Sequence, residues 1–354
     1  MSTSHTHKKN IYALSPEELQ ALVLQMGESK FRVQQISDWL YNKRVTSFAQ
    51  MTNISKELRT KLEDMFVFGW LQVEMEQNSA DGTKKRLYRL HDGKLIESVL
   101  MPYQDGRRTA CISSQAGCAM ACSFCATGQM GFARHLSAAE IFEQAQQFAN
   151  ELQEQGERLS NIVLMGMGEP FHNYDAVIEA IGLLRDRLGI GARKITVSTV
   201  GLVPKIRAFA QEGLQVKLAI SLHSTVNEDR SKIMPINKKY PVEELMQACR
   251  EFVEATGRRI TFEYALIHGK NDTVEEATRL QKLLQGLLCH VNVIPLNPTA
   301  GYDGTPSDPQ RVAEFVAVLE KAGIPATVRV RRGIDIDAGC GQLQSKRILG
   351  TNLA

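Results

Sequence analysis

The sequence predicts an α/β fold in which a parallel sheet is closed or partly closed into a barrel, preceded by a smaller accessory domain of helices and β-hairpins. Strand-like and helical segments alternate six times after residue 109, as expected for parallel strands covered by helices. Before that point the pattern is first helical and then alternating. The 354 residues suffice for two or three domains and for a large core without disulfides.

The first helical stretch runs from residue 15 to about residue 66. Ser15, Pro16 and Glu18 form a typical helix start, with serine as the N-cap, proline at the first position and glutamate in the first turn. From residue 31 to residue 41, apolar residues recur at the spacing of an amphipathic helix. We therefore expect helices in this segment.

Residues 70–103 change to short alternating runs. Asp81-Gly82 and Asp92-Gly93 are typical of hairpin turns, so these runs predict antiparallel strands. The chain is therefore expected to divide into an accessory domain over residues 1–103, a core domain over 104–345 and a C-terminal tail over 346–354.

The core domain is expected to begin with a strand near residue 109. Its predicted strands are Thr109–Ser113, Asn161–Gly166, Lys194–Ser198, Val216–Ser221, Arg259–Leu266 and Val291–Leu296. One helix starts at Ser137, which forms a capping-box pattern with Glu140. The other predicted helices are Tyr174–Leu188, Val242–Ala255 and Val274–Leu287. A last strand, Thr327–Arg332, leads into a glycine-rich segment.

Composition and charge exclude several classes of protein. Apolar residues make up 43% and charged residues 23%, which excludes a wholly disordered or collagen-like chain. No run of about 18 apolar residues is present, and the first ten residues lack the apolar region of a signal peptide. Seven unevenly spaced cysteines do not suggest a secreted disulfide framework. We expect a cytoplasmic protein with no membrane association; its net charge of +3 indicates no partner.

The strongest chemical pattern is the three-cysteine motif of Cys118, Cys122 and Cys125. Three thiolates within eight residues can converge on one metal centre, and the small residues around them let the loop wrap closely. A structural zinc normally takes four protein ligands, and no second cysteine pair follows. A cubane [4Fe–4S] cluster held by three cysteines leaves one iron open to another ligand. We favour the cluster; zinc or buried thiols are the alternatives.

This motif, with Phe124 before its third cysteine, resembles that of radical S-adenosylmethionine (SAM) enzymes. In that superfamily the open iron binds SAM, and an electron from the cluster cleaves SAM to a 5′-deoxyadenosyl radical. The resemblance spans about Phe31 to Leu343 and implies a partial (βα)6, TIM-like radical SAM barrel with a small N-terminal domain. Six segments are similar to the RlmN family, which methylates carbon 2 of adenosine in 23S rRNA and tRNA: Met165–Pro170, Ser198–Gly201, Ile220–His223, Met234–Lys239, Asn297–Pro298 and Gly333–Leu343.

The resemblance also implies which residues bind SAM. Gly166 and Gly168 allow a ligand to approach the backbone closely, and Glu169 can accept hydrogen bonds from an ammonium group. Taken singly, a glycine after a strand is usually a turn, and His223 would more often be a packed residue. The implied SAM-binding residues are Gly168, Glu169, Ser198, Ser221, Leu222, His223 and Asn297.

Two further cysteines, Cys340 and Cys111, are implied to act as a pair. Cys340 lies between two glycines, whereas Cys111, inside a strand, could equally be an inert buried cysteine. Carbon 2 of adenine is electron-poor and cannot attack a sulfonium methyl group, whereas a thiolate can. The resemblance implies that Cys340 takes a methyl group from one SAM, and that the radical from a second SAM activates it to add to the base. Attack of Cys111 on Cys340 then gives a disulfide and releases the methylated RNA.

Glu97 is the implied proton acceptor. Alternation places it on the same strand face as Leu95 and Val99. A carboxylate on an apolar face is costly to bury, so the sequence alone favours an exposed Glu97 on an edge strand. The RlmN family, however, has a proton-accepting glutamate at the matching position.

The implied cofactors are one [4Fe–4S] cluster and SAM, two molecules per turnover. The implied partners are 23S rRNA and tRNA, contacted in part by the accessory domain, and a low-potential electron donor such as flavodoxin. We expect a monomer. Basic clusters such as Lys84-Lys85-Arg86, and Arg329 with Arg331-Arg332, could contact phosphates, although such clusters usually mark solvated faces.

Three alternatives remain open. The Cfr group, which methylates carbon 8, shares the cluster and the cysteine pair; Pro170 favours the carbon-2 group, while Leu296 and Gly339 depart from its usual Trp and Ala. A glycyl-radical activase would need neither Cys340 nor Cys111. A non-catalytic iron–sulfur or zinc protein that binds RNA would cleave no SAM.

Overall fold

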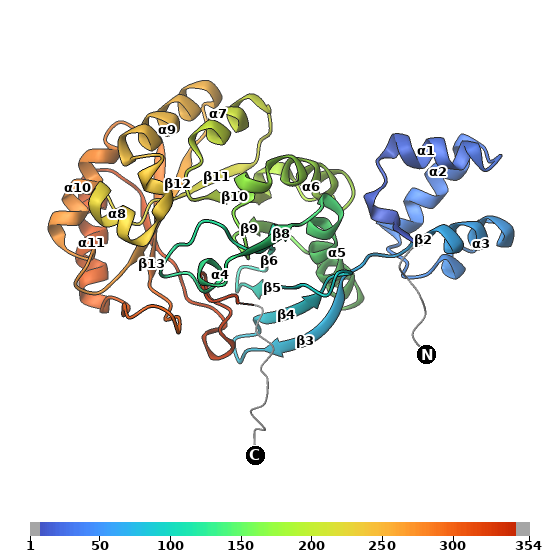
Figure 1. Cartoon of the computed structure of the whole chain (residues 1–354), viewed down its shortest axis with the longest axis horizontal. Helices are drawn as coiled ribbons and strands as arrows, with labels where there is room; N and C mark the ends of the chain where they lie inside the picture. Colours follow the sequence, from blue (N-terminus) through green and yellow to red (C-terminus); the bar gives the residue numbers. More distant parts are fainter. Residues whose placement is uncertain (1–7, 345–354) are drawn as a thin grey trace, which may run out of the picture.

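The computed structural model describes residues 8–344, which form a small N-terminal helical part and a larger barrel-like part (Figure 1). The small part contains helices α1 (Pro16–Gln25), α2 (Lys30–Ser37) and α3 (Lys56–Met65), and strands β1 (Lys9–Asn10) and β2 (Phe66–Val67), which pair with each other. The predicted cap of the first helix is confirmed: the Ser15 side chain accepts from the Glu18 N–H, and the Glu18 carboxylate accepts from the Ser15 N–H at 2.8 Å. The predicted tail 346–354 and Ser345 lie outside the described residues.

The larger part is built on one sheet, which has ten strands within residues 8–344. From β6 to β14 all neighbours in this sheet are parallel, whereas β3, β4 and β5 are antiparallel. The sheet is not closed, because its first and last strands in the order do not pair with each other, which confirms the predicted partial barrel. In sheet order the strands are β14 (Ala326–Val328), β13 (Cys289–Pro295), β12 (Ile260–Leu266), β11 (Lys217–Ser221), β10 (Ile195–Thr199), β9 (Asn161–Leu164), β6 (Arg108–Cys111), β5 (Leu95–Pro102), β4 (Lys84–Arg89) and β3 (Gln72–Asn78).

The six predicted core strands are present within two residues of their expected bounds. The seventh is shorter than predicted: after β14 the Arg329 N–H still donates to the Val293 carbonyl at 2.8 Å, but the chain then leaves the sheet. The predicted hairpin turns are also present, with Gly82 and Gly93 at positive φ. The expected boundary near residue 103 falls between β5 and β6, two strands of this same sheet. The division into domains therefore stays a prediction.

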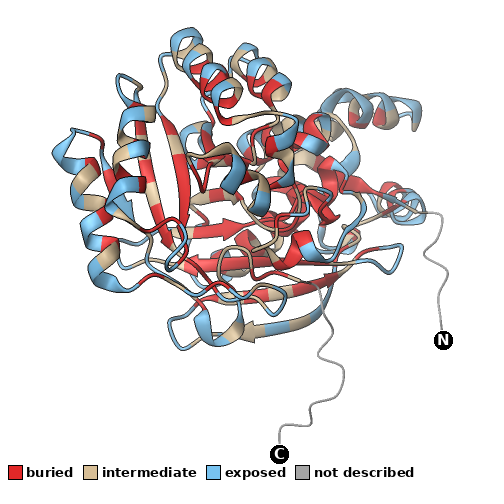
Figure 2. Ribbon diagram, turned by 60° about the vertical axis from the view of Figure 1, so that its left-hand side comes forward, coloured by how far each residue is buried: buried red, intermediate tan, exposed pale blue. Residues whose placement is uncertain are grey.

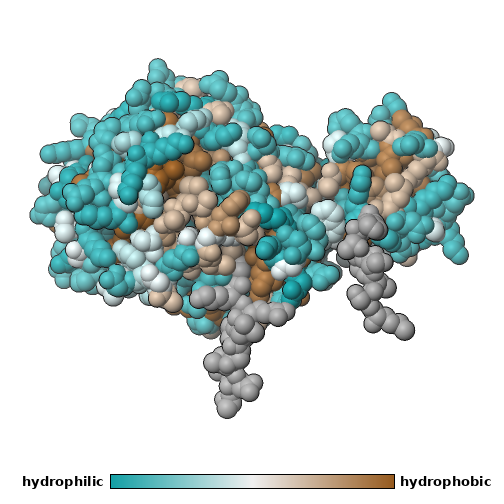
Figure 3. All heavy atoms as spheres, viewed as in Figure 1, coloured by the Kyte–Doolittle hydropathy of each residue, from teal (hydrophilic) through white to brown (hydrophobic). Residues whose placement is uncertain are grey.

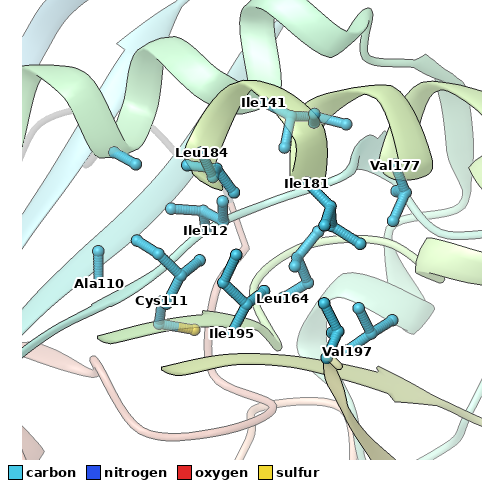
Figure 4. Packing of buried hydrophobic residues seen from close by; sticks show 14 of the residues in the cluster. Ala110, Cys111, Ile112, Ile141, Leu164, Val177, Ile181, Leu184, Ile195 and Val197 are labelled. Carbon is cyan, nitrogen blue, oxygen red and sulfur yellow. The ribbon is translucent and has the colours of Figure 1, made fainter. Parts of the chain in front are cut away.

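Helices cover the outer face of the sheet and bury it with their apolar sides (Figure 2). Ile141, Ile181 and Leu184 pack over the strand residues Ile112 and Leu164, and all five are essentially fully buried (Figure 4). Full burial of one such side chain contributes about 1.5–3 kcal/mol. The covering helices are α5 (Ala138–Glu154), which starts with the predicted Ser137–Glu140 capping box, α6 (Tyr174–Asp186), α7 (Val203–Gln211), α9 (Val242–Thr256), α10 (Val274–Leu284) and α11 (Pro309–Lys321).

Short elements occupy the end of the barrel where the parallel strands finish. They are α4 (Ala126–Gln129), α8 (Asn227–Ile233) and the paired strands β7 (Gln115–Gly117) and β8 (Phe132–His135). β7 lies just before the three-cysteine motif and α4 just after it, and α8 follows the segment Ile220–His223. Across residues 8–344, no helix combines the length and the apolar character that a membrane span requires.

A buried carboxylate joins the N-terminal helical part to the barrel. Glu143 on α5 accepts hydrogen bonds from the backbone N–H groups of Trp70 at 2.9 Å and Leu71 at 2.8 Å, and from the Asn10 amide at 3.3 Å. Gly69 is at φ +81°, and a side chain there would overlap this carboxylate. Burial raises the pKa of Glu143 to about 7, and the backbone hydrogen bonds from Trp70 and Leu71 oppose the shift. This side chain therefore contributes to the connection between the two parts, together with the contacts of Tyr12 and Tyr41 with Phe142.

Glu143→Ala should lower the free energy of unfolding by about 2 kcal/mol, because it leaves two buried N–H groups without their acceptor. Glu154→Ala, an exposed position on the same helix, is the matched control and should change it by less than about 0.5 kcal/mol. Urea unfolding of both variants at pH 7.5 checks this. Equal stability of the two variants would show that Glu143 does not support the connection.

Candidate active site

A cavity opens at the carboxyl ends of the parallel strands, where barrel enzymes place their chemistry. Its empty volume, the part open to solvent included, is about 950 Å³. It is lined by residues at the ends of β9, β10, β11 and β13, by the three-cysteine loop and by the segment that carries Cys340. Hydrophobic residues gather in the middle of this part of the molecule and are surrounded by a hydrophilic rim (Figure 3). The arrangement is that of a ligand cavity rather than a packed barrel interior.

The three-cysteine loop depends on glycine at two positions. Gly117 is at φ +74°, and a Cβ there would overlap the carbonyl oxygen of Gly131, which accepts the Cys118 N–H at 2.8 Å. A Cβ at Gly128 would lie 2.9 Å from the backbone nitrogen of Cys122. The third cysteine, Cys125, is the N-cap residue of α4. The small residues noted in the sequence are therefore required by the close path of the backbone.

The electrostatics of this loop suit thiols that bind metal. Burial raises the pKa of Cys118 to about 12 and that of Cys122 well above its ordinary value, and the neighbouring thiols add to both shifts. Bound iron would supply the positive charge that keeps such thiolates ionised. Within residues 8–344 no three Cys, His, Asp or Glu side chains are grouped for one metal ion. A cubane does not need that grouping, because each thiolate binds a different iron; the donor set therefore fits a [4Fe–4S] cluster.

Gly168 and Glu169 lie together at the cavity wall. Gly168 is at φ +101°, and a Cβ there would lie 2.6 Å from the Cβ of Gln115. The Gln115 side-chain oxygen accepts the Glu169 N–H at 2.8 Å. The buried Glu169 carboxylate accepts the Phe171 N–H at 3.0 Å and the Val200 N–H at 2.8 Å. Burial raises its pKa to about 7, so a cationic ligand beside it would favour the ionised form.

The five remaining implied SAM-binding residues lie at or just after the ends of strands in the sheet. Ser198, Ser221, His223 and Asn297 all line the cavity, as do Gly168 and Glu169. Leu222 does not; its side chain is fully buried in the core, and its carbonyl accepts a hydrogen bond from Arg230 at 2.9 Å. The structure thus brings six of the seven implied residues to one cavity, and any contact from Leu222 would come from its backbone.

His223 has a defined proton arrangement. Its Nδ1 accepts the Ala265 N–H at 2.9 Å, which leaves the ring proton on Nε2. Burial lowers the pKa of His223 to about 3, so the ring is neutral. His223 is at φ +59°, and its ring lies edge-on to Phe124 with the centroids 5.0 Å apart. A neutral histidine with a free N–H donor therefore faces the loop that carries the cysteine motif.

Cys111 and Cys340 line a second, smaller cavity together with Arg329. Cys340 also lines the main cavity, and its carbonyl accepts a hydrogen bond from Asn297 at 3.1 Å. The pKa of Cys111 is raised to about 12, mainly by burial and in part by the nearby Cys340 thiol, while Arg329 opposes the shift. The structure thus brings together the two cysteines that are 229 positions apart in the chain.

The expectation that Glu97 is exposed on an edge strand is wrong. β5 lies between β4 and β6, and Glu97 is only 5% exposed. Alternation identified the face of the strand but could not show that β4 pairs along the edge of β5 or that the segment ending at Gln344 lies against this face. The Glu97 carboxylate lies 3.7 Å from the Lys85 ammonium and accepts the Gln344 N–H at 2.9 Å.

Glu97 belongs to a third cavity, which it lines with Lys85 and Gln344. Val99 pairs with Cys111 across β5 and β6, so Glu97, two residues before Val99, is on the same face of the sheet as Cys111. The segment 335–344 lines this cavity as well as the one that contains the cysteine pair. Glu97 is therefore near the cysteine pair in the sheet but does not share a cavity with it.

Sequence reasoning missed the roles of two arginines. Arg329, grouped above with possible RNA contacts, instead lies in the site, where it lines both cavities that contain Cys340 and is 3.9 Å from the Glu263 carboxylate. Arg230 is fully buried behind the cavity wall. The Lys84-Lys85-Arg86 cluster is also divided: Lys84 and Arg86 form ion pairs with Glu151, whereas Lys85 faces Glu97. Nothing in the local sequence distinguishes these buried cations from surface ones.

Comparison with known proteins gives the same picture over the whole chain. Residues 112–280 match the Radical SAM superfamily, and residues 9–68 match the ribosomal RNA large subunit methyltransferase N-terminal domain. A probable dual-specificity RNA methyltransferase RlmN of Geobacillus thermodenitrificans is 49% identical over 341 residues, 95% of this chain and 93% of that protein. A dual-specificity RNA methyltransferase RlmN 1 of Myxococcus xanthus is 49% identical over 339 residues, 95% of this chain and 94% of that protein.

A solved structure is similar over nearly the same length. The crystal structure of a radical SAM methyltransferase from Sphaerobacter thermophilus matches with a TM-score of 0.92 and 46% sequence identity. The match covers 96% of this chain and 100% of that one. The partial barrel and the small N-terminal part are therefore both shared with that protein.

Gly117→Ala should weaken iron binding, because the added methyl group overlaps the carbonyl that holds Cys118. Backbone strain of this kind costs roughly 1–3 kcal/mol, equivalent to about one to two orders of magnitude in affinity. Iron and sulfide content after anaerobic reconstitution measures the effect. Gly156→Ala is the control, since its φ of +73° matches that of Gly117 and a Cβ there meets nothing within 4 Å. Equal iron content in the two variants would contradict this account of the loop.

Proposed function

The chain belongs to the RlmN family of radical SAM RNA methyltransferases, and we propose that it methylates carbon 2 of adenosine in 23S rRNA and tRNA through a covalent intermediate on Cys340. One observation carries this proposal: Cys340 lines the main cavity with Cys122 and Cys125 and also lines the cavity of Cys111. A residue that accepts a methyl group in one cavity and is later attacked by a second thiol must reach both.

The residues around the main cavity have binding roles in this proposal. Cys118, Cys122 and Cys125 would hold the [4Fe–4S] cluster that the family implies. When bound, that cluster supplies the electron that cleaves SAM to methionine and a 5′-deoxyadenosyl radical. The Glu169 carboxylate and the His223 Nε2–H supply an acceptor and a donor for the polar groups of SAM. Ser198, Ser221 and Asn297 at the cavity wall, and the backbone of Gly168 and Leu222, would complete the SAM-binding set.

The two cysteines of the pair differ in reactivity. Burial raises the pKa of Cys111 to about 12, so it stays a thiol at neutral pH and is a poor competitor for the methyl group. Cys340, partly exposed in the cavity, would accept the methyl group. The 5′-deoxyadenosyl radical would remove a hydrogen atom from that group, and the resulting carbon radical would add to the base, after which the adduct would lose one electron, returned to the cluster, and one proton. Cys111 then attacks the Cys340 sulfur, which gives a disulfide and frees the methylated RNA. Arg329 lines the cavity of both sulfurs and favours the thiolate that this attack requires.

Glu97 is the proposed proton acceptor for the adduct. Its carboxylate accepts the Gln344 N–H at 2.9 Å and lies 3.7 Å from the Lys85 ammonium. Residues of the segment 335–344 line both the cavity of Glu97 and the cavity of the cysteine pair. We therefore propose that a small shift of this segment joins the two cavities.

The wider setting follows the family. We propose that two SAM molecules are used per turnover, that a low-potential donor such as flavodoxin delivers the electron, and that the protein acts as a monomer in the cytoplasm. The N-terminal part, which matches the family's N-terminal domain, would contact the RNA.

The direct test is anaerobic reconstitution followed by reaction with SAM, a reductant and 23S rRNA or tRNA. Nuclease digestion and mass spectrometry should identify 2-methyladenosine. A product that is 8-methyladenosine would assign the chain to Cfr-like chemistry. Unmodified RNA with no 5′-deoxyadenosine above background would favour a non-catalytic iron–sulfur protein that binds RNA.

Cys111→Ala should trap RNA covalently on the protein, because no thiol remains to attack Cys340. Denaturing gels of labelled RNA measure the trapped fraction, and Cys249→Ala, a buried cysteine outside the site, is the control. Continued turnover by the Cys111 variant, with no crosslink, would reject the pairing.

Glu97→Gln should retain methylation of Cys340 but stall proton removal from the RNA adduct. Peptide mass spectrometry measures S-methylcysteine at residue 340, and loss of the product should approach the 10²–10⁴-fold range typical of a general base. Product formation within about twofold of wild type would exclude Glu97 as the base.

A further inference from the structure

Arg230 is a buried cation without an anionic partner. Arg230 is 0% exposed, and no other arginine that the structure describes is as deeply buried. Its guanidinium donates to the carbonyls of Leu222 at 2.9 Å, Val200 at 2.8 Å and Ser221 at 3.1 Å, and to the side-chain oxygen of Asn237 at 2.9 Å. All four acceptors are neutral, and within residues 8–344 no carboxylate forms an ion pair with it.

Burying a guanidinium among neutral groups alone lowers the stability of the folded protein. Carbonyl groups satisfy the N–H donors but do not neutralise the charge, and an uncompensated buried charge is strongly destabilising. Two other arginines at or near the site do have carboxylate partners: Arg329 lies 3.9 Å from Glu263, and Arg134 lies 2.8 Å from Glu140. A fully buried arginine with neutral partners alone therefore suggests that a negative group completes its surroundings.

The cysteine loop is where that group would lie. Arg230 is on α8, and the last residue of this helix, Ile233, accepts the Ser123 N–H at 3.0 Å. Ser123 is the neighbour of Cys122 in the loop. The carbonyls that Arg230 holds belong to Val200 and Ser221, which line the same cavity as Cys122. The guanidinium thus sits directly behind the wall of the cluster cavity.

We propose that Arg230 is a positioning residue with an electrostatic role: it places a fixed positive charge behind the [4Fe–4S] cluster and makes the cluster easier to reduce. A cubane held by three thiolates has a net negative charge, which increases when it takes up one electron from the low-potential donor. A nearby fixed cation stabilises the reduced state more than the oxidised one, and cluster potentials respond to such charges. No bond forms or breaks in this step. The inference rests on the cluster of the proposed function.

The test compares the midpoint potential of variants that differ in charge. In Arg230→Gln the equilibrium constant for reduction should fall about tenfold, which for a one-electron couple is a midpoint lower by about 59 mV. Arg44→Gln is the matched control, because Arg44 also donates to backbone carbonyls, those of Ala149 and Tyr41, but lies in the N-terminal part. Its potential should not change. Redox titration of the anaerobically reconstituted proteins, followed by electron paramagnetic resonance, gives both values.

Arg230→Lys separates charge from positioning. Lysine keeps the positive charge but cannot reach all four acceptors, so the potential should stay near that of wild type while SAM binding weakens. If Arg230→Gln binds no cluster, the midpoint potential of Arg230→Lys tests the inference instead. The inference is overturned if Arg230→Gln binds the cluster and its midpoint potential is unchanged. It is also overturned if the midpoint potential of Arg230→Lys falls by about 59 mV, which is a tenfold decrease in the equilibrium constant for reduction. A lysine variant that folds but loads no cluster also contradicts it. Wild-type protein without any cluster signal would instead overturn the proposed function.

Discussion

The path of the three-cysteine loop constrains the rest of the site, because backbone hydrogen bonds tie it to three other parts of the chain. Cys118 donates to Gly131 beside β8, Ser123 donates to Ile233 at the end of α8, and Ala126 donates to Gly341, next to Cys340. A shift of the loop would therefore move the wall of the cavity and the segment that carries Cys340 together. Glycine at 117 and 128 lets the backbone approach closely enough for these bonds to form.

Charge is distributed around this loop in a consistent way. Arg329 lies at the cysteine pair with Glu263 as its partner, Lys85 lies beside Glu97, and Arg230 lies behind the cavity wall with neutral partners. Arg329 and Arg230 thus lie beside the cavities that contain Cys340, whereas Lys85 lines the third cavity together with Glu97. The segment 335–344 lines both the Glu97 cavity and the cavity of the cysteine pair.

Much of this could be predicted from the sequence, for identifiable reasons. The core strands and the α5 cap follow from periodicity and capping residues, which are local properties, and the three-cysteine motif is a local spacing. The burial of Glu97 could not be predicted, because alternation defines a face but shows neither the neighbouring strand β4 nor the distant segment, ending at Gln344, that lies against that face. Arg230 sits in a short polar helix and gives no sign of burial, since its partners are backbone carbonyls at the ends of β10 and β11 and the side chain of Asn237. Similarly, the pairing of Arg329 with Glu263 depends on contacts between β13, β12 and the chain after β14.

The central claim is that one cavity holds the cluster, SAM and Cys340 together. The most direct measurement is electron–nuclear double resonance of the reduced, anaerobically reconstituted protein with SAM that carries ¹⁵N in its methionine amine. The account predicts hyperfine coupling between that nitrogen and the cluster, which is lost in a Cys122→Ala variant. A reduced cluster that forms normally in the wild-type protein but shows no coupling to bound SAM would contradict it.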